Sequence, residues 1–116
     1  MALKVTNNDI DGVIVVHLSG TLFFNEESIS LRVHVKDLLE KSRRIVLDLE
    51  NVTRIDSSGL GILVALCVSA RKVGGDIKLA NLGQHINEAL RITRLVTVFD
   101  IFGKTEDAVE AFQVLN

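Results

Sequence analysis

The chain has 116 residues, of which 47% are hydrophobic and 24% are charged, a composition that excludes a disordered chain and a fibrous repeat. This length predicts one domain, residues 1–116, with a core that needs neither metal nor disulfides, and the one cysteine, Cys67, allows no internal disulfide. Thirteen basic residues against fifteen acidic ones leave a net charge of -2, which argues against direct binding of nucleic acid.

The first residues lack the charged and apolar regions of a secretory signal. The longest apolar run, residues 60–68, is about half of the roughly 20 residues that a membrane-spanning helix needs. The sequence therefore predicts a cytoplasmic protein with no membrane partner.

Two strands joined by a hairpin are predicted at the N-terminus. Leu3 and Val5 alternate with polar residues, and residues 13–18 form a mostly β-branched run, so both segments are typical of strands. The Asn, Asp and Gly residues within 7–12 are turn formers, which predicts an antiparallel connection. We expect Gly20 to end the second strand.

A first helix is predicted from an N-cap at Asn25 to about Lys41. Acidic residues follow the cap and basic residues gather at the far end, which matches the helix dipole. Apolar residues recur at the spacing of one buried stripe, namely Leu31, Val35, Leu38 and Leu39.

The rest of the chain alternates between predicted strands and helices. Residues 45–49 are typical of an interior strand, and a loop is expected at 50–56. A helix over 57–73 follows, ended by two glycines. Its buried stripe is predicted to be Leu60, Leu63, Leu66 and Ala70. Further strands are predicted at 76–81 and 96–99, and further helices at 84–92 and 104–113.

Strands separated by helices favour right-handed parallel crossovers. The sequence therefore predicts the α/β class, as a mixed sheet with an N-terminal antiparallel hairpin, parallel crossovers and about four helices.

The most unusual local sequence is Asp56-Ser57-Ser58-Gly59-Leu60-Gly61, where a loop leaves a strand and enters a helix. In a structural interpretation, Asp56 or Ser57 caps the helix and the glycines allow close packing against the sheet. In a functional interpretation, a serine exposed at the positive end of the helix dipole accepts or contacts a phosphoryl group. Both interpretations can hold for one residue.

Other catalytic and binding motifs fit this chain poorly. The run lacks the G-x-S-x-G pattern of a nucleophilic serine, and His17, His34 and His85 would reach it only through folding. No pair of His or Cys residues has metal-ligand spacing, and the glycines match neither a dinucleotide fingerprint nor a P-loop. The sequence thus predicts no cofactor and no metal, and a small serine hydrolase is the remotest alternative.

Phe23 and Phe24 fall in the loop between the second predicted strand and the first predicted helix. Two adjacent side chains there are difficult to bury together, so one is expected to pack into the core. The other is either incidental or a hydrophobic contact for a partner.

Several of these segments resemble the STAS domains of anti-sigma factor antagonists, over essentially the whole chain. The resemblance is carried most of all by Ile55-Asp56-Ser57-Ser58-Gly59-Leu60-Gly61, a specific pattern in this setting. Further matches are Leu18-Ser19-Gly20, Ile45-Val46-Leu47-Asp48-Leu49, Gly74-Gly75 and Val98-Phe99-Asp100-Ile101-Phe102.

The resemblance implies a partner-switching protein without catalytic residues of its own. In that family the unmodified antagonist binds an anti-sigma factor, which is also a serine kinase, and so releases a sigma factor for transcription. The kinase phosphorylates a serine of the motif, and a metal-dependent serine phosphatase reverses the step. By alignment that serine is Ser57, with Ser58 as the less favoured alternative. The residues expected at the partner interface are Phe23, Phe24, Asp56, Ser57, Ser58, Gly59 and Leu60.

One departure from the family pattern lies just after Gly20. Many members carry there an acidic residue that helps kinase recognition, whereas this chain has Thr21, Leu22, Phe23 and Phe24. The change suggests a more hydrophobic interface or a regulator outside sigma-factor control. The alternative function is therefore a STAS scaffold that does not switch and that binds a nucleotide or another protein through the same loops.

Overall fold

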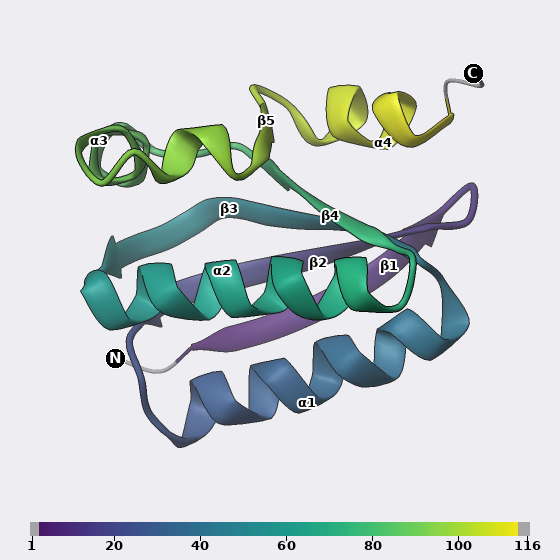
Figure 1. Ribbon diagram of the computed structural model, residues 1–116, viewed down its shortest axis with the longest axis horizontal. Coiled ribbons are helices and arrows are strands. Elements are labelled where there is room, and N and C mark those ends of the chain that lie inside the picture. Colours follow the sequence, from purple (N-terminus) through teal and green to yellow (C-terminus); the bar gives the residue numbers. More distant parts are fainter. Residues whose placement is uncertain (1–2, 114–116) are drawn as a thin grey trace.

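The computed structural model describes residues 3–113 and shows a mixed sheet with helices on both faces (Figure 1). Five strands lie in the order β1-β2-β3-β4-β5, with β1 antiparallel to β2 and the other pairs parallel, which confirms the predicted α/β class. Of the predicted domain, residues 1, 2 and 114–116 lie outside the described part. The elements are β1 (Lys4–Ile10), β2 (Val13–Leu22), α1 (Glu26–Lys41), β3 (Arg44–Ile55), α2 (Ser57–Lys72), β4 (Asp76–Ala80), α3 (Gln84–Ile92), the 3-10 helix η1 (Leu95–Thr97), β5 (Asp100–Phe102) and α4 (Thr105–Gln113).

The N-terminal hairpin forms as predicted, but its turn is shorter than the sequence indicates. Only Asp11 and Gly12 lie between β1 and β2, at φ of 53° and 86°, which is the conformation of a tight two-residue hairpin turn. Residues 7–10, expected in the turn, are paired with β2 instead. Polar residues are tolerated there because β1 is an edge strand with mostly exposed side chains.

The next two strands are both longer than predicted. Gly20 does not end β2, which continues to Leu22, and β3 covers all but the last residue of the loop expected at 50–56. The register between the strands shifts twice, and Gly20 takes a φ of 109° beside the second shift. Such irregularities interrupt the alternation of apolar residues on which a strand prediction relies. The irregular pairing of β2 with β3 therefore explains why both strands were predicted too short.

The first helix begins at the predicted cap. Asn25 Oδ1 accepts a hydrogen bond from the Ser28 N–H (3.1 Å), and Ser28 Oγ accepts one from the Asn25 N–H (2.9 Å). Two backbone donors that the helix leaves unpaired are thereby satisfied reciprocally. The capping box was not anticipated, because Ser28 replaces the more usual Glu or Gln.

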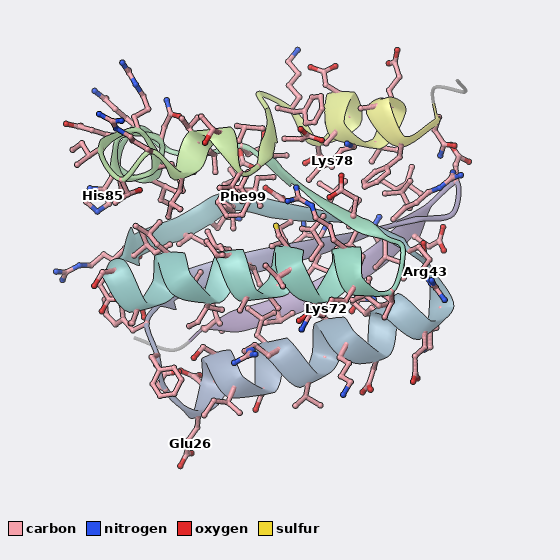
Figure 2. All side chains as sticks on the ribbon, in the orientation of Figure 1. Glu26, Arg43, Lys72, Lys78, His85 and Phe99 are labelled. Atoms are coloured by element: carbon pink, nitrogen blue, oxygen red, sulfur yellow. The ribbon has the colours of Figure 1, made fainter. Side chains whose placement is uncertain are left out.

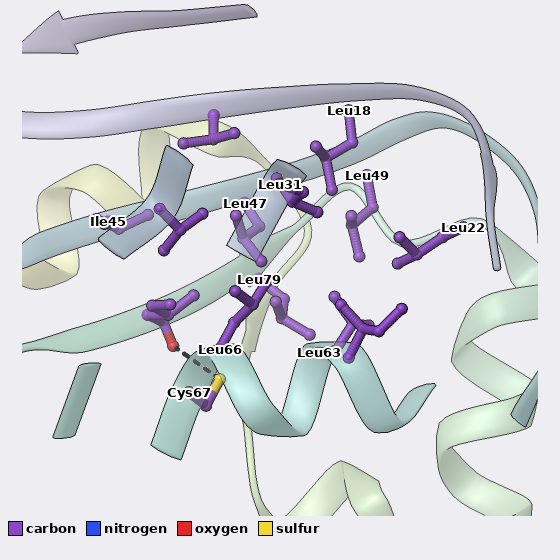
Figure 3. Close-up of a cluster of buried hydrophobic side chains, with 14 of the residues drawn as sticks. Leu18, Leu22, Leu31, Ile45, Leu47, Leu49, Leu63, Leu66, Cys67 and Leu79 are labelled. Carbon is purple, nitrogen blue, oxygen red and sulfur yellow. Dashed lines mark hydrogen bonds between the residues drawn. The ribbon is translucent and has the colours of Figure 1, made fainter. Parts of the chain in front are cut away.

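The main core lies between the sheet and the helix pair α1 and α2 (Figure 3). Both predicted helix stripes are buried in it in full. Cys67 lies in this core, where burial raises the pKa of its thiol to about 12. A thiol in this environment stays protonated and unreactive at neutral pH.

The C-terminal part contains the one misplaced strand. Residues 96–99, expected as a strand, include most of η1, and the strand comes later, as β5 beside β4. Phe99 is nevertheless buried, so the apolar run reflects core packing rather than strand formation. Helix α3 lies towards the end of the sheet to which β3 points (Figure 1). Helix α4 covers the face of the sheet opposite α1 and α2. None of the helices within residues 3–113 is long and apolar enough to cross a membrane.

A chain of polar side chains crosses the α4 face of the sheet. His17 on β2 bonds Asn8 on β1 through Nε2 (2.8 Å) and Asp48 on β3 through Nδ1 (2.6 Å). Asn81, just after β4, donates from Nδ2 to Asp48 Oδ1 (2.8 Å) and to Thr105 Oγ1 at the start of α4 (2.8 Å). We call these five residues the polar chain. It links β1, β2, β3 and the segment after β4 with the last helix.

Candidate functional site

The pairing of β2 with β3 brings two loops together at the carboxyl edge of the sheet. Leu22 pairs with Ile55, so the chain leaves both strands at the same level. From β2 it enters the loop at 23–25, and from β3 it passes through Asp56 directly into α2. In open α/β sheets this edge is where ligands commonly bind. All residues predicted for the partner interface lie here, on the loop or in the first turn of α2: Phe23, Phe24, Asp56, Ser57, Ser58, Gly59 and Leu60.

The first turn of α2 lies against the end of β2 because Gly59 has no side chain. A Cβ at Gly59 would overlap the carbonyl oxygen of Leu22 and would come within 2.7 Å of Ile55 Cγ1. The position therefore needs glycine for close approach rather than for an unusual φ. This contact sets the distance between α2 and the loop that follows β2.

Asp56 is the N-cap of α2. Its Oδ1 accepts hydrogen bonds from the Ser58 hydroxyl (2.6 Å) and from the Gly59 N–H (2.9 Å). These two bonds, the Ser58 bond first, lower the pKa of the Asp56 carboxyl from its ordinary value. The cap is therefore ionised at neutral pH. The structural interpretation of the motif is confirmed for the cap, which is Asp56 rather than Ser57, and for Gly59, but not for Gly61, where a Cβ would meet nothing within 4 Å.

The two adjacent serines differ in their hydrogen bonds. Ser58 Oγ donates to Asp56 and accepts from the Phe24 N–H (3.0 Å), so it ties the loop after β2 to the helix cap. Ser57 is also exposed, but its hydroxyl makes no hydrogen bond with any of the residues 3–113. Of the two hydroxyls, that of Ser57 is therefore the one available to another molecule.

The electrostatic environment of Ser57 combines opposite influences. Ser57 is the first residue of a helix of 16 residues, so its hydroxyl lies at the positive end of the helix dipole. The first turn of α2 contains no acidic side chain, and the residue before Ser57 is the carboxylate of the cap, Asp56. A helix N-terminus of this kind stabilises an added phosphate through its dipole and its unpaired N–H groups. The site is thus chemically suited to accept a phosphoryl group on Ser57.

The partner surface predicted from the sequence divides into exposed and buried parts. Phe24 is 62% exposed and Phe23 is half-buried, so the two rings are not buried together, as expected. The expectation that one of them packs into the core is not met, because Phe23 belongs to neither cluster of core residues. The hydrogen bond from the Phe24 N–H to Ser58 holds this loop beside the first turn of α2. Leu60 is 6% exposed and Gly59 is buried, so these two residues seat the helix and offer little surface.

A serine hydrolase would need a histidine beside Ser57 or Ser58. The described part of the chain contains no hydrogen bond of this kind. His17 has both ring nitrogens in the polar chain, and His34 bonds Asn7 Oδ1 (3.0 Å). His85 lies on α3 (Figure 2). Within residues 3–113 there is also no group of three or more His, Cys, Asp or Glu side chains that could hold a metal ion.

In the sequence, only the family resemblance favours Ser57 over Ser58, because the residue pattern by itself does not separate the two serines. The bond that occupies Ser58 comes from Phe24, 34 residues earlier, and depends on where β2 ends. The one available signal was Gly59, because a glycine in the first turn of a helix indicates a close neighbour. The identity of that neighbour, the Leu22 carbonyl, follows only from the strand register.

Comparison with known proteins finds one family along most of the chain. The family model of the STAS domain matches residues 4–108. The anti-sigma-B factor antagonist of Bacillus subtilis is 31% identical over 108 residues, which are 93% of this chain and 94% of that protein. The crystal structure of an anti-sigma factor antagonist from Mycobacterium paratuberculosis has a similar fold, with a TM-score of 0.81 at 24% identity over 97% of this chain and 96% of that one. The Bacillus cell fate determinant SpoIIAA in its phosphorylated form also shares the fold, with a TM-score of 0.71 at 18% identity over 96% of this chain and 99% of that one.

Proposed function

Because the chain belongs to the STAS domain family, we propose that it is an anti-sigma factor antagonist whose binding is switched by phosphorylation of Ser57. One observation carries the proposal. The Ser57 hydroxyl is exposed and makes no hydrogen bond with the described residues, whereas the neighbouring Ser58 hydroxyl is held between Asp56 and Phe24.

The partner is an anti-sigma factor that is also the serine kinase, and a metal-dependent phosphatase reverses the modification. In the forward step Ser57 Oγ bonds to the γ-phosphorus of ATP, the bond from that phosphorus to the bridging oxygen breaks so that ADP leaves, and the hydroxyl proton passes to a base of the kinase. This chain supplies the acceptor and the docking surface, and the partner supplies the catalytic groups. The name of the Bacillus subtilis relative, an anti-sigma-B factor antagonist, supports the partner class. The phosphorylated form of SpoIIAA supports the modification. The cycle consumes ATP in the cytoplasm.

The docking surface consists of the exposed Phe24 ring and the first turn of α2. An acidic recognition residue is absent from the segment 21–24, so the contact with the partner is more apolar than in many relatives. Aromatic side chains are frequent anchors of protein interfaces. Ser57 lies within this surface rather than beside it, and a change in its charge therefore acts directly on docking.

Phosphorylation releases the partner without unfolding the domain. The phosphate adds about -1.5 to -2 charges at pH 7, and the dipole at the start of α2 favours a negative group there by roughly 0.3–1 kcal/mol. Docking would instead remove the phosphate from water, and desolvation of an unpaired charge costs several kcal/mol. A cost of about 4 kcal/mol weakens binding about a thousandfold. The folded state thus tolerates the modification while the complex does not.

The modification is tested by incubating the protein with its cognate anti-sigma kinase and ATP. Trypsin cuts after Arg54 and Arg71, and the resulting peptide contains both serines of the motif. We expect fragmentation to place the phosphate on Ser57. The Ser57→Ala variant should take up none, whereas Ser58→Ala should retain the acceptor. Phosphate found on Ser58 in the wild-type protein would contradict the assignment.

Switching is tested by measuring the affinity of the anti-sigma factor for the charge variants. Ser57→Ala should bind it whether or not ATP is present, and Ser57→Asp should bind poorly, because only the second variant carries a charge at the interface. Both should melt close to the wild-type temperature. Undiminished binding by Ser57→Asp and by the phosphorylated protein would contradict the switch and favour a scaffold that does not switch.

A further inference from the structure

A groove of about 590 Å³ runs between α1 and α2, a volume typical of ligand sites. Its α1 wall is a single face of that helix between Ile29 and Glu40, with lining residues every three or four positions, and Arg43 lines the groove just beyond the end of α1. At 1.5 Å per residue this wall is about 16 Å long. The α2 wall comes from the C-terminal half of that helix, residues 66–73. The groove is therefore elongated along the helices.

The groove combines an apolar floor with apolar walls. Val35 and Leu66 are buried at the floor. Ile29, Val33 and Val73 line the walls and are 47%, 57% and 44% exposed. A row of exposed branched side chains along a concave surface is a feature of interaction sites rather than of ordinary surface.

The charges around the groove are one-sided. Four basic residues line it, and Glu40 is the one acidic residue among them. In the whole chain acidic residues outnumber basic ones, fifteen to thirteen, so the positive charge is local to this surface. None of the four basic side chains forms an ion pair within residues 3–113. The four are Arg32, Lys36, Arg43 and Lys72.

The basic residues are spread along the groove instead of gathering at one end. Arg32 and Lys36 lie one turn apart on α1, and Arg43 follows two residues after that helix ends. Lys72 and Arg43 lie near the end where α2 and α1 finish (Figure 2). One carboxylate, such as the head of a fatty acid, can reach only part of this row. A flat membrane surface cannot enter a groove between two helices. A ligand that matches the row needs several acidic groups along an apolar stripe.

We propose that this groove is a second docking surface, and that it binds an amphipathic helix of a partner protein with acidic side chains flanking an apolar stripe. A helix of about three turns matches the length of the α1 wall. Its stripe covers the exposed branched side chains, and its acidic flanks pair with the four basic residues. Helix-in-groove binding is a recurrent mode of peptide recognition.

The groove is separate from the phosphorylation site. Leu66, the first α2 residue that lines it, is nine residues from Ser57, or about 13 Å along the helix. The groove therefore remains open when Ser57 is phosphorylated, and the proposal does not depend on the switch.

The probe is a synthetic peptide of about 11 residues, with Leu at helical i, i+3, i+4 and i+7 positions and Glu on both flanks. Its matched control has the same Leu positions with Lys in place of Glu. We expect the acidic peptide to bind in the micromolar range by fluorescence anisotropy, less tightly as salt rises because the attraction is electrostatic. The basic peptide should not bind. Amide shifts on binding should follow residues 29–43 and 66–73, and should be absent from residues 56–60.

Two exposed valines provide a matched pair of variants. Val33→Glu changes the groove wall, whereas Val68→Glu changes an exposed position on α2 that does not line the groove. The first should weaken the acidic peptide at least about tenfold, a difference that corresponds to 1.4 kcal/mol, and the second should leave its affinity unchanged. Reversing Arg32 and Lys36 to Glu should have a similar effect to Val33→Glu, and Arg91→Glu on α3 should have none.

Several outcomes would overturn the proposal. Equal binding of the acidic and basic peptides, or equal effects of the two valine variants, would show that the groove does not select its ligand by charge and shape. Failure of the acidic peptide to bind would also reject it. Saturable binding of decanoate or of phosphatidylglycerol vesicles, without binding of the peptide, would assign the groove to a fatty acid or to a membrane instead.

Discussion

At the residue scale, Ser58 connects the helix cap with the loop after β2. Its hydroxyl gives a hydrogen bond to Asp56 and receives one from the Phe24 N–H. Because the Ser58 bond is the first cause of the lowered pKa of Asp56, we expect Ser58→Ala to raise that pKa toward its ordinary value. A carbon-detected NMR titration of the Asp56 carboxyl measures this change.

Ser57→Ala is the matched control for this titration, since the Ser57 hydroxyl makes no bond with the described residues. That variant should leave the pKa of Asp56 where it is. An equal rise in the two variants would mean that the hydroxyl of Ser58 does not hold the cap.

The sequence pattern around Asp56 was sufficient to predict a cap and an exposed serine, because both follow from local spacing. By itself the pattern did not decide between Ser57 and Ser58, and only the family resemblance favoured Ser57. That decision depends on the Phe24 N–H, which reaches Ser58 only because β2 extends two residues beyond Gly20.

At the element scale, the packing of α2 on β2 depends on one glycine. A methyl group at Gly59 would overlap the Leu22 carbonyl, which is backbone and cannot turn away. We expect Gly59→Ala to lower the free energy of unfolding by about 1–3 kcal/mol, as overpacking does. Urea denaturation measures the change.

Gly61 provides the control for this substitution, since a Cβ there meets nothing within 4 Å. Gly61→Ala should raise the free energy of unfolding by about 0.5–1 kcal/mol, because alanine favours the helix more than glycine does. Equal effects of the two substitutions would contradict the close approach of α2 to β2.

The helices were easier to predict than the strands. The stripes of α1 and α2 repeat over several turns, and every member of both is buried as expected. The strands β2 and β3 were cut short because register shifts interrupt their alternation. The strand expected at 96–99 failed for a different reason, since Phe99 is buried without being paired in the sheet. Burial alone does not distinguish a residue that is paired in the sheet from one that is buried outside it.

At the scale of the whole molecule, the polar chain connects α4 with strands that lie far from it in the sequence. Burial by itself would raise the pKa of Asp48. The hydrogen bonds from Asn81, from the N–H of residue 50 and from His17 outweigh that effect, so the pKa lies below its ordinary value of 3.8. A carboxyl whose pKa is lowered by folding stabilises the folded state above its unfolded pKa, and this contribution is lost as pH falls through the folded pKa.

We therefore expect the free energy of unfolding to decrease as the pH is lowered from about 4, and we attribute part of the decrease to Asp48. Asp48→Asn should be less stable than the wild type at pH 7 and should lose less stability in acid. Denaturation curves at several pH values measure both effects. Asp37→Asn, at an exposed position on α1, is the control and should follow the wild-type pH dependence. A parallel decrease in Asp48→Asn and the wild type would remove Asp48 from the explanation.

The two margins of the sheet have a consequence for self-association. On one side, the seven-residue strand β1 faces the solvent, and Val5 and Ile10 are its only apolar residues. On the other side, β5 has just three residues. An edge strand can pair with a strand of another molecule, and polar or very short edge strands make this pairing less favourable. We expect concentrated solutions of this domain to resist fibril formation, whatever else docks on its helices.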